Sequence, residues 1–277
     1  MKLGFLIILN LSWFPVYSQL VTGKIVDADT KNPIGYVNIG VVGGYKGTVC
    51  DNDGSFSLNL SQQNDFDTLR ISIIGYYPIS FTVGDFKKIF QQNLGGLVIE
   101  LAKKAIVLKE VIVSPIEFKE KKEGSKGKLG VVAFETNPDT SLGSEVGTVI
   151  KVKKAPALIR DVNFVFKGTT YDDSILFRIN IYSMNNEHPG ETILSEPIYV
   201  VTNITKGILT VNLEKYNMYV ENDFMVALEW LQELGEKELR FGTGLKGKSF
   251  MRVTSQGDWD RFPLGSIGIF ATILNVK

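Results

Sequence analysis

Short strand-like segments, separated by turns about every ten residues, most constrain how this chain can fold. Between residues 19 and 113, runs rich in Val, Ile, Phe and Tyr alternate with Gly, Asp and Asn. This spacing is typical of a β-sandwich. A helix is predicted only over residues 85–92, where Asp85 is a candidate N-cap. The sequence therefore predicts a β-sandwich with one short peripheral helix in this region.

The same strand pattern resumes between residues 131 and 277. Three runs have apolar side chains on one face: Ile175, Phe177, Ile179 and Ile181; Leu209, Val211 and Leu213; and Phe224, Val226, Leu228 and Trp230. The run at residues 266–276 is apolar on both faces, which is typical of a central strand. We therefore expect an all-β protein whose second half is an antiparallel β-sandwich or jelly roll.

A charged segment separates the two β-rich parts. Residues 114–130 carry eight charges, one Pro and three Gly. Such a segment buries too little apolar area to offset the entropy lost on ordering, so we predict a flexible linker. The alternative is an exposed loop of one larger domain. The predicted domains are thus residues 19–113 and 131–277.

The first eighteen residues have the features of a secretory signal peptide. Lys2 is followed by an apolar run over residues 3–16, and Ser18 is a small residue at the expected cleavage site. The alternative, a retained membrane anchor, needs roughly 20 apolar residues, and this run is shorter and contains Asn10. We predict cleavage after Ser18 and an exported chain with no transmembrane segment after cleavage.

Charge and composition make several functions improbable. The 30 Lys and Arg residues balance 30 Asp and Glu residues, so no excess positive field attracts nucleic acid. The one Cys excludes an internal disulfide framework, and the one His leaves few ways to build a histidine metal site or a Ser-His-Asp triad. We expect no catalytic constellation, no metal, no cofactor and no nucleic-acid partner.

Five segments of the first domain carry a family resemblance. In order they are GKIVD at residues 23–27, TKNPI at 30–34, VNI at 37–39, GTVCDNDGSF at 47–56 and ISIIGY at 71–76. Together they resemble the carboxypeptidase regulatory-like domain, a transthyretin-like β-sandwich common in exported proteins of Bacteroidetes. The second half is similar, less specifically, to uncharacterised β-sandwich domains that accompany this module.

The resemblance implies a seven-stranded sandwich and a place in the periplasm or at the outer membrane. It implies no peptidase activity, because the namesake domain is an accessory fold that contributes no catalytic residue. The LKEVIV stretch at residues 108–113 fits the segment that, in this family, leads into the plug of TonB-dependent outer-membrane receptors. No plug or barrel follows it here, so the resemblance carries over no transport role.

Two glycine-containing motifs have both a structural and a functional interpretation. Residues 51–54, Asp-Asn-Asp-Gly, predict a turn in which Gly54 takes a positive φ. A calcium loop is the alternative, but its twelfth position is Gln62 instead of Glu. Residues 242–249 match the P-loop pattern, yet a strand-like run follows Ser249 where a helix is required. We predict a glycine-rich β-hairpin there.

Trp259 is the main candidate for ligand binding. It lies among turn-forming and charged residues, where a core side chain is not expected. Its ring is suited to stacking on a sugar, while the neighbouring Asp258, Asp260 and Arg261 offer hydrogen bonds to hydroxyl groups. The alternative is that Trp259 closes the open end of the sandwich.

The sequence therefore favours a non-enzymatic, exported binding module of the cell envelope. Its predicted partner is an envelope protein, and the alternative is a glycan held by end loops of the second domain. An enzymatic alternative, a hydrolase with paired carboxylates, needs two such groups roughly 5 to 10 Å apart in a cleft. No spacing in the sequence indicates such a pair.

Overall fold

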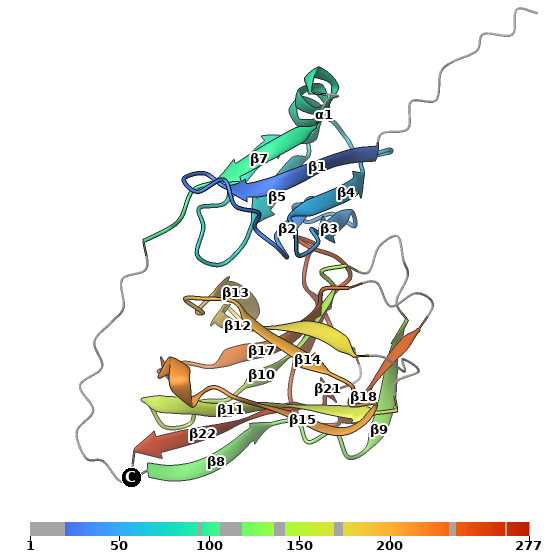
Figure 1. The fold of residues 1–277 in the computed structure, drawn as a ribbon. Helices are drawn as coiled ribbons and strands as arrows, with labels where there is room; N and C mark the ends of the chain where they lie inside the picture. Colours follow the sequence, from blue (N-terminus) through green and yellow to red (C-terminus); the bar gives the residue numbers. More distant parts are fainter. Residues whose placement is uncertain are drawn as a thin grey trace, which may run out of the picture.

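The computed structural model describes residues 20–93, 96–105, 118–135, 142–168, 174–232, 237–263 and 265–276. These residues form two β-sandwiches, one placed on the other (Figure 1). The all-β prediction is confirmed. The predicted signal segment and its cleavage site after Ser18 lie outside the described residues. Within the described part of the chain, no helix has the length and apolar character needed to cross a membrane.

The N-terminal sandwich has seven strands in two sheets, as predicted. The first sheet has the order β4-β1-β7, formed by β4 (Ser55–Asn59), β1 (Leu20–Asp27) and β7 (Leu97–Leu101). The second has the order β3-β2-β5-β6, formed by β3 (Gly47–Val49), β2 (Asn38–Val41), β5 (Thr68–Ser72) and β6 (Ile79–Thr82). Inward-facing side chains such as Ile25, Ile39 and Leu69 are fully buried between the two sheets.

Helix α1 (Val83–Gln92) begins two residues before the predicted start. Its N-cap is Thr82 and not Asp85, because the Thr82 hydroxyl accepts a hydrogen bond from the Asp85 backbone N–H at 3.0 Å. Asp85 lies in the first turn, where its negative charge is favourable near the helix N-terminus. Phe86 is fully buried and joins the helix to the core of the sandwich.

The C-terminal sandwich consists of a seven-stranded and an eight-stranded sheet, and its strands pair antiparallel as predicted. The seven-stranded sheet contains β13 (His188–Thr192), β12 (Ile175–Asn185), β17 (Phe224–Trp230), β10 (Glu145–Ile150), β19 (Ser249–Arg252) and β20 (Asp260–Arg261) in this order, with β14 (Ile198–Thr202) beside β12.

The eight-stranded sheet covers the opposite side of the core. It contains β21 (Ser266–Ile267), β18 (Glu238–Gly244), β11 (Ala157–Lys167), β22 (Ile269–Val276) and β8 (Phe118–Gly124) in this order, with β9 (Gly130–Glu135) beside β18 and both β15 (Lys206–Asn212) and β16 (Tyr219–Val220) beside β11. The short helix η1 (Glu214–Tyr216) connects β15 to β16.

The predicted inner faces fill the space between these two sheets. The core contains the predicted side chains of β12 and β17, namely Ile175, Phe177, Ile179 and Ile181 with Phe224, Val226, Leu228 and Trp230. The predicted central strand lies between β11 and β8, where Ala271 and Ile273 are buried. Strand alternation therefore located the core of this domain correctly.

The structure corrects the linker prediction for residues 118–130. Phe118–Gly124 form β8, which pairs with β22 along its whole length, and β9 begins at Gly130. Backbone pairing and ion pairs order this charged segment: Lys153 lies 3.0 Å from Glu123, and Arg160 lies 2.6 Å from Glu120. Charged side chains are typical of an edge strand such as β8, because they discourage pairing with other chains.

Residues 242–249 do not form the predicted hairpin. Strand β18 belongs to the eight-stranded sheet and β19 to the seven-stranded sheet, so the glycine-rich turn crosses from one layer to the other. A strand and not a helix follows this turn, so the geometry of a P-loop is not present. The turn at residues 51–54 is as predicted, with Gly54 at a φ of 81° and Asp53 accepting from the Ser55 backbone N–H at 3.0 Å.

Asp27 is a buried carboxylate that closes a turn after β1. Its Oδ1 accepts from the backbone N–H groups of Thr30 and Asp29 at 2.8 and 3.0 Å. Its Oδ2 accepts from the Tyr76 hydroxyl at 3.0 Å and lies 3.3 Å from Lys103 Nζ. The backbone N–H of Thr30 contributes most to lowering the pKa of Asp27 well below its usual range, against the opposing effect of burial.

We expect Asp27→Asn to lower the thermal unfolding midpoint at pH 7, and the difference from wild type to shrink as the pH falls below about 4. The folded state holds the carboxylate ionised, so its stabilisation is present above the unfolded pKa of about 3.9 and is lost as the pH decreases. Thermal unfolding between pH 7 and pH 2.5 measures this, with the exposed Asp29→Asn as the matched control. A difference that does not change with pH would contradict this role of Asp27.

Candidate functional site

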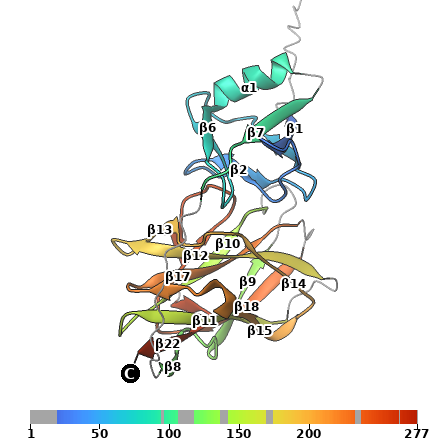
Figure 2. The ribbon, with the colours of Figure 1, turned by 60° about the vertical axis from the view of Figure 1, so that its left-hand side comes forward.

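A cleft of about 720 Å³ lies between the two sandwiches. In both orientations the N-terminal sandwich sits on the outer side of the seven-stranded sheet (Figure 1, Figure 2). The cleft takes its walls from both domains, with Arg70, Ser72, Tyr76 and Lys104 from the first and Arg178, Asn180, Tyr182, Glu191, Arg252, Gln256 and Trp259 from the second. This volume is within the range of about 300–1,000 Å³ that is common for small-molecule sites.

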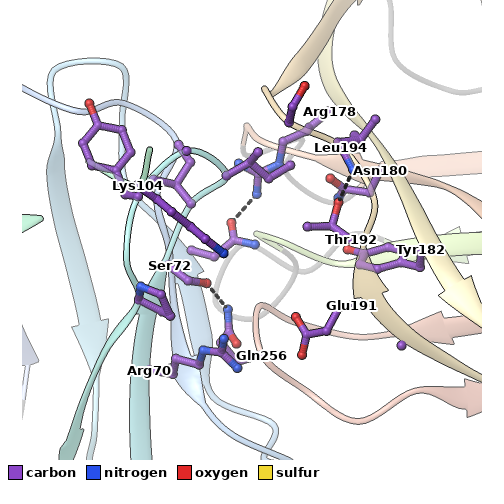
Figure 3. Close-up of a pocket in the computed structure, with 18 of the residues that line it drawn as sticks. Arg70, Ser72, Lys104, Arg178, Asn180, Tyr182, Glu191, Thr192, Leu194 and Gln256 are labelled. Carbon is purple, nitrogen blue, oxygen red and sulfur yellow. Dashed lines mark hydrogen bonds between the residues drawn. The ribbon is translucent and has the colours of Figure 1, made fainter. Parts of the chain in front are cut away.

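The loop between β19 and β20 fixes the two domains to each other. The Gly43 backbone N–H donates to the Gln256 carbonyl at 3.0 Å, and Gln256 Nε2 donates to Ser72 Oγ at 2.9 Å (Figure 3). Gly40 faces the same loop so closely that a Cβ at this position would lie 2.1 Å from the Ser255 carbonyl oxygen. Only glycine permits this approach of one backbone to the other.

Four charged residues form a row across the outer face of the seven-stranded sheet. Arg178 on β12, Glu229 on β17, Glu145 on β10 and Arg252 on β19 stand directly opposite one another in the register of neighbouring strands. Residues so placed have their Cβ atoms about 5 Å apart. We call these four residues the charged row.

Each carboxylate of the charged row is held by one guanidinium group. Arg178 contacts Glu229 through two hydrogen bonds, Nε to Oε2 and Nη2 to Oε1, both at 2.7 Å. Arg252 pairs with Glu145, which also accepts from the Tyr182 hydroxyl at 3.0 Å. Both glutamates are fully buried. Burying a carboxylate without a partner costs free energy, and each arginine offsets this cost for the glutamate that it contacts.

Burial and ion pairing shift the pKa values of these groups in opposite directions. Burial raises the pKa of Glu145; Arg252 opposes this rise and the neighbouring Glu229 adds to it. Burial disfavours the charged form of Arg178, but Glu229 outweighs this effect and raises its pKa above the ordinary value. Glu145 does the same for the pKa of Arg252. Both guanidinium groups therefore remain charged.

The N-terminal domain covers one end of the charged row. Arg178 Nη1 donates to the Tyr36 carbonyl oxygen at 2.7 Å, and its Nη2 donates to the Asn38 side chain. The rings of Tyr36 and Tyr199 pack with centroids 5.3 Å apart beside this contact. The same arginine therefore completes the ion pair of one domain and binds the other domain.

Trp259 lies in the cleft as part of an aromatic and cationic cluster. The Arg252 guanidinium carbon is 4.8 Å from the centroid of the Trp259 ring, and the Tyr182 ring meets Trp259 edge to face at 5.5 Å. Trp259 remains half-buried and lines the cleft. It therefore lies beside the interface between the domains.

The other predicted site residues do not join Trp259 in the cleft. Asp258, Asp260 and Arg261 are exposed and are absent from the lining of the cleft. Sequence reasoning missed Tyr182 and Arg252, the residues that contact Trp259. Strand alternation along β12 implies only that Arg178, Asn180 and Tyr182 lie on the face away from the core.

The carboxylates of the charged row do not form the free pair that a hydrolase uses. Glu145 and Glu229 are each bound by an arginine, and neither lines the cleft. A glycoside hydrolase needs two carboxyl groups that face its substrate. Among the described residues no cluster of His, Cys, Asp and Glu is arranged to hold a metal ion.

Residues 21–113 match the family model of the CarboxypepD_reg-like domain. The family predicted from the five sequence segments is thereby confirmed for this domain. No curated protein sequence matches the chain.

Solved structures of the VP2 protein of infectious bursal disease virus are among those that resemble the chain. The VP2 subviral particle has 10% sequence identity and a TM-score of 0.28, with 92% of this chain and 63% of that chain covered. The structure of the Gt strain has 11% identity and a TM-score of 0.28, with 92% and 62% covered. The chain thus spans less than two thirds of these viral chains.

We expect Arg178→Leu to reduce the stability of the C-terminal domain by about 3–5 kcal/mol, because it leaves the Glu229 carboxylate buried without its partner. The double variant Arg178→Leu/Glu229→Leu should lose less, since no unpaired charge remains. Urea unfolding followed by tryptophan fluorescence measures both variants. A double variant that is less stable than the single one would contradict this view of the charged row.

Proposed function

We propose that this chain is a non-enzymatic binding module of the cell envelope and that it binds its ligand in the cleft between its two domains. The premise is the CarboxypepD_reg-like domain at residues 21–113, a family without catalytic function. The observation that carries the proposal is the cleft of about 720 Å³ with walls from both domains. The signal-like sequence of residues 1–18 supports export, to the periplasm or the outer membrane.

A glycan is the ligand class that the cleft favours. Tyr76, Tyr182 and Trp259 give it aromatic surface, which suits the apolar face of a sugar ring. The amide nitrogens of Asn180 and Gln256 donate to Glu229 and Ser72, and their amide oxygens can accept from the hydroxyl groups of a sugar. The glycan would then lie in the cleft between the domains and not at the end loops of the second domain. An envelope protein as partner is the other outcome of the test.

Tryptophan fluorescence can test glycan binding directly. Once residues 1–18 are removed, only Trp230 and Trp259 remain, and Trp230 is buried in the core. We expect a saturable change in emission with a soluble glycan, and a loss of about tenfold or more in affinity in Trp259→Ala. The matched control is Phe66→Ala, which removes an aromatic ring that is 90% exposed and does not line the cleft.

The outcome separates the two ligand classes. If no glycan in a panel of neutral and acidic oligosaccharides changes the emission of the folded protein, the glycan candidate is wrong. Cross-linking in intact cells would then be used to find a protein partner. A failure to find either would contradict the binding function itself.

The signal-like segment at residues 1–18 predicts that the protein is exported and that this segment is removed. We expect the chain recovered from the envelope fraction to begin at Gln19, because the predicted cleavage follows Ser18. The intact mass of the recovered protein measures this. A cytoplasmic chain that retains residues 1–18 would show that the localisation is wrong.

A further inference from the structure

We propose that the cleft selects a glycan that carries a carboxylate, such as a short oligosaccharide of uronic acids. This inference rests on the proposed function and names the ligand class of the same site. The charges of the cleft lining carry the argument, together with the aromatic surface beside them.

The cleft has more positive charge than its own acidic groups neutralise. Of its four basic side chains, Arg178 and Arg252 are paired within the charged row. The other two, Arg70 and Lys104, form no ion pair with any residue that the structure describes. The only acidic residue in the lining is Glu191, so the unpaired groups comprise two positive charges and one negative charge.

Arg70 and Lys104 lie on the same wall, which belongs to the N-terminal domain. Arg70 is on β5 and lies beside Gln256, and Lys104 extends toward Ser72 (Figure 3). The backbone of Lys104 is fixed, because its N–H donates to the Gly75 carbonyl oxygen at 2.8 Å. Arg70 is half-buried, so its charge is less screened by solvent than that of a fully exposed side chain.

The opposite wall supplies a hydrogen-bond acceptor. Glu191 is exposed and accepts hydrogen bonds from hydroxyl groups.

These features fit an acidic sugar better than a phosphate. A carboxylate needs one or two charged donors, and Arg70 and Lys104 provide them. The hydroxyl groups of the sugar ring that carries this carboxylate suit Glu191 and Gln256. The sugar ring itself suits the aromatic surface of Trp259. A phosphate would carry more negative charge toward Glu191 and would leave the aromatic surface unused.

The test compares trigalacturonic acid with its methyl ester by isothermal titration calorimetry. The two probes have the same rings and hydroxyl groups and differ in charge. We expect the acid to bind at least about tenfold more tightly in 50 mM salt, and this preference to decrease at 500 mM salt because ions screen the attraction.

Three variants test which residues cause the preference for the acid over its methyl ester. Arg70→Gln combined with Lys104→Gln should bind the acid and the ester equally, and Glu191→Gln should bind the acid several-fold more tightly than wild type. Lys206→Gln is the matched control, because Lys206 is an exposed lysine on β15, in the sheet far from the cleft. It should leave both affinities unchanged.

Each of the other possible outcomes contradicts a different part of the proposal. Equal binding of acid and ester by the wild type overturns the selection for carboxylate but leaves the binding function intact. A preference that persists in the Arg70→Gln/Lys104→Gln variant overturns the assigned residues. Competition by inorganic phosphate, or tighter binding of an acidic peptide, overturns the sugar. The absence of any glycan binding contradicts both this inference and the glycan candidate.

Discussion

Two carboxylates buried side by side are the constraint on which the junction of this protein depends. Glu145 and Glu229 face each other on neighbouring strands beneath a second domain, and a buried charge costs several kcal/mol unless it is paired. Arg252 pairs with Glu145 and Arg178 pairs with Glu229, and these two ion pairs offset the cost. Arg178 also binds the first domain, and Arg252 supports Trp259, so the ion pairs, the interface and the cleft share the same side chains.

The residues on the inner faces of the sandwiches could be predicted from the sequence, but the contacts made by the outer faces could not. Alternation along β12 correctly placed Ile179 in the core and Arg178 on the opposite face. It carries no information on what covers that opposite face, and here the first domain buries Arg178 almost completely. The one available signal was Glu229, which lies in the otherwise apolar run of β17 and therefore suggests a buried partner.

The remaining differences arise where a segment pairs with strands distant in the sequence. The composition of residues 118–124 indicates a solvated segment, and their side chains are indeed largely exposed, but their backbone completes a sheet with the C-terminal strand. Trp259 lines the cleft, whereas Asp258, Asp260 and Arg261, its neighbours in the sequence, do not. Its neighbours in space, Tyr182 and Arg252, come from strands β12 and β19.

The backbone contact at Gly40 has a consequence for the energetics of recognition. Where two domains touch through main-chain atoms, with no space for even a methyl group, they have little freedom to slide or hinge. The cleft between them is then preorganised, and a ligand does not have to spend its binding energy on closing it. A cleft of this kind is expected to discriminate between ligands by their fit to a fixed shape, with an association rate set by diffusion and orientation and not by a conformational step.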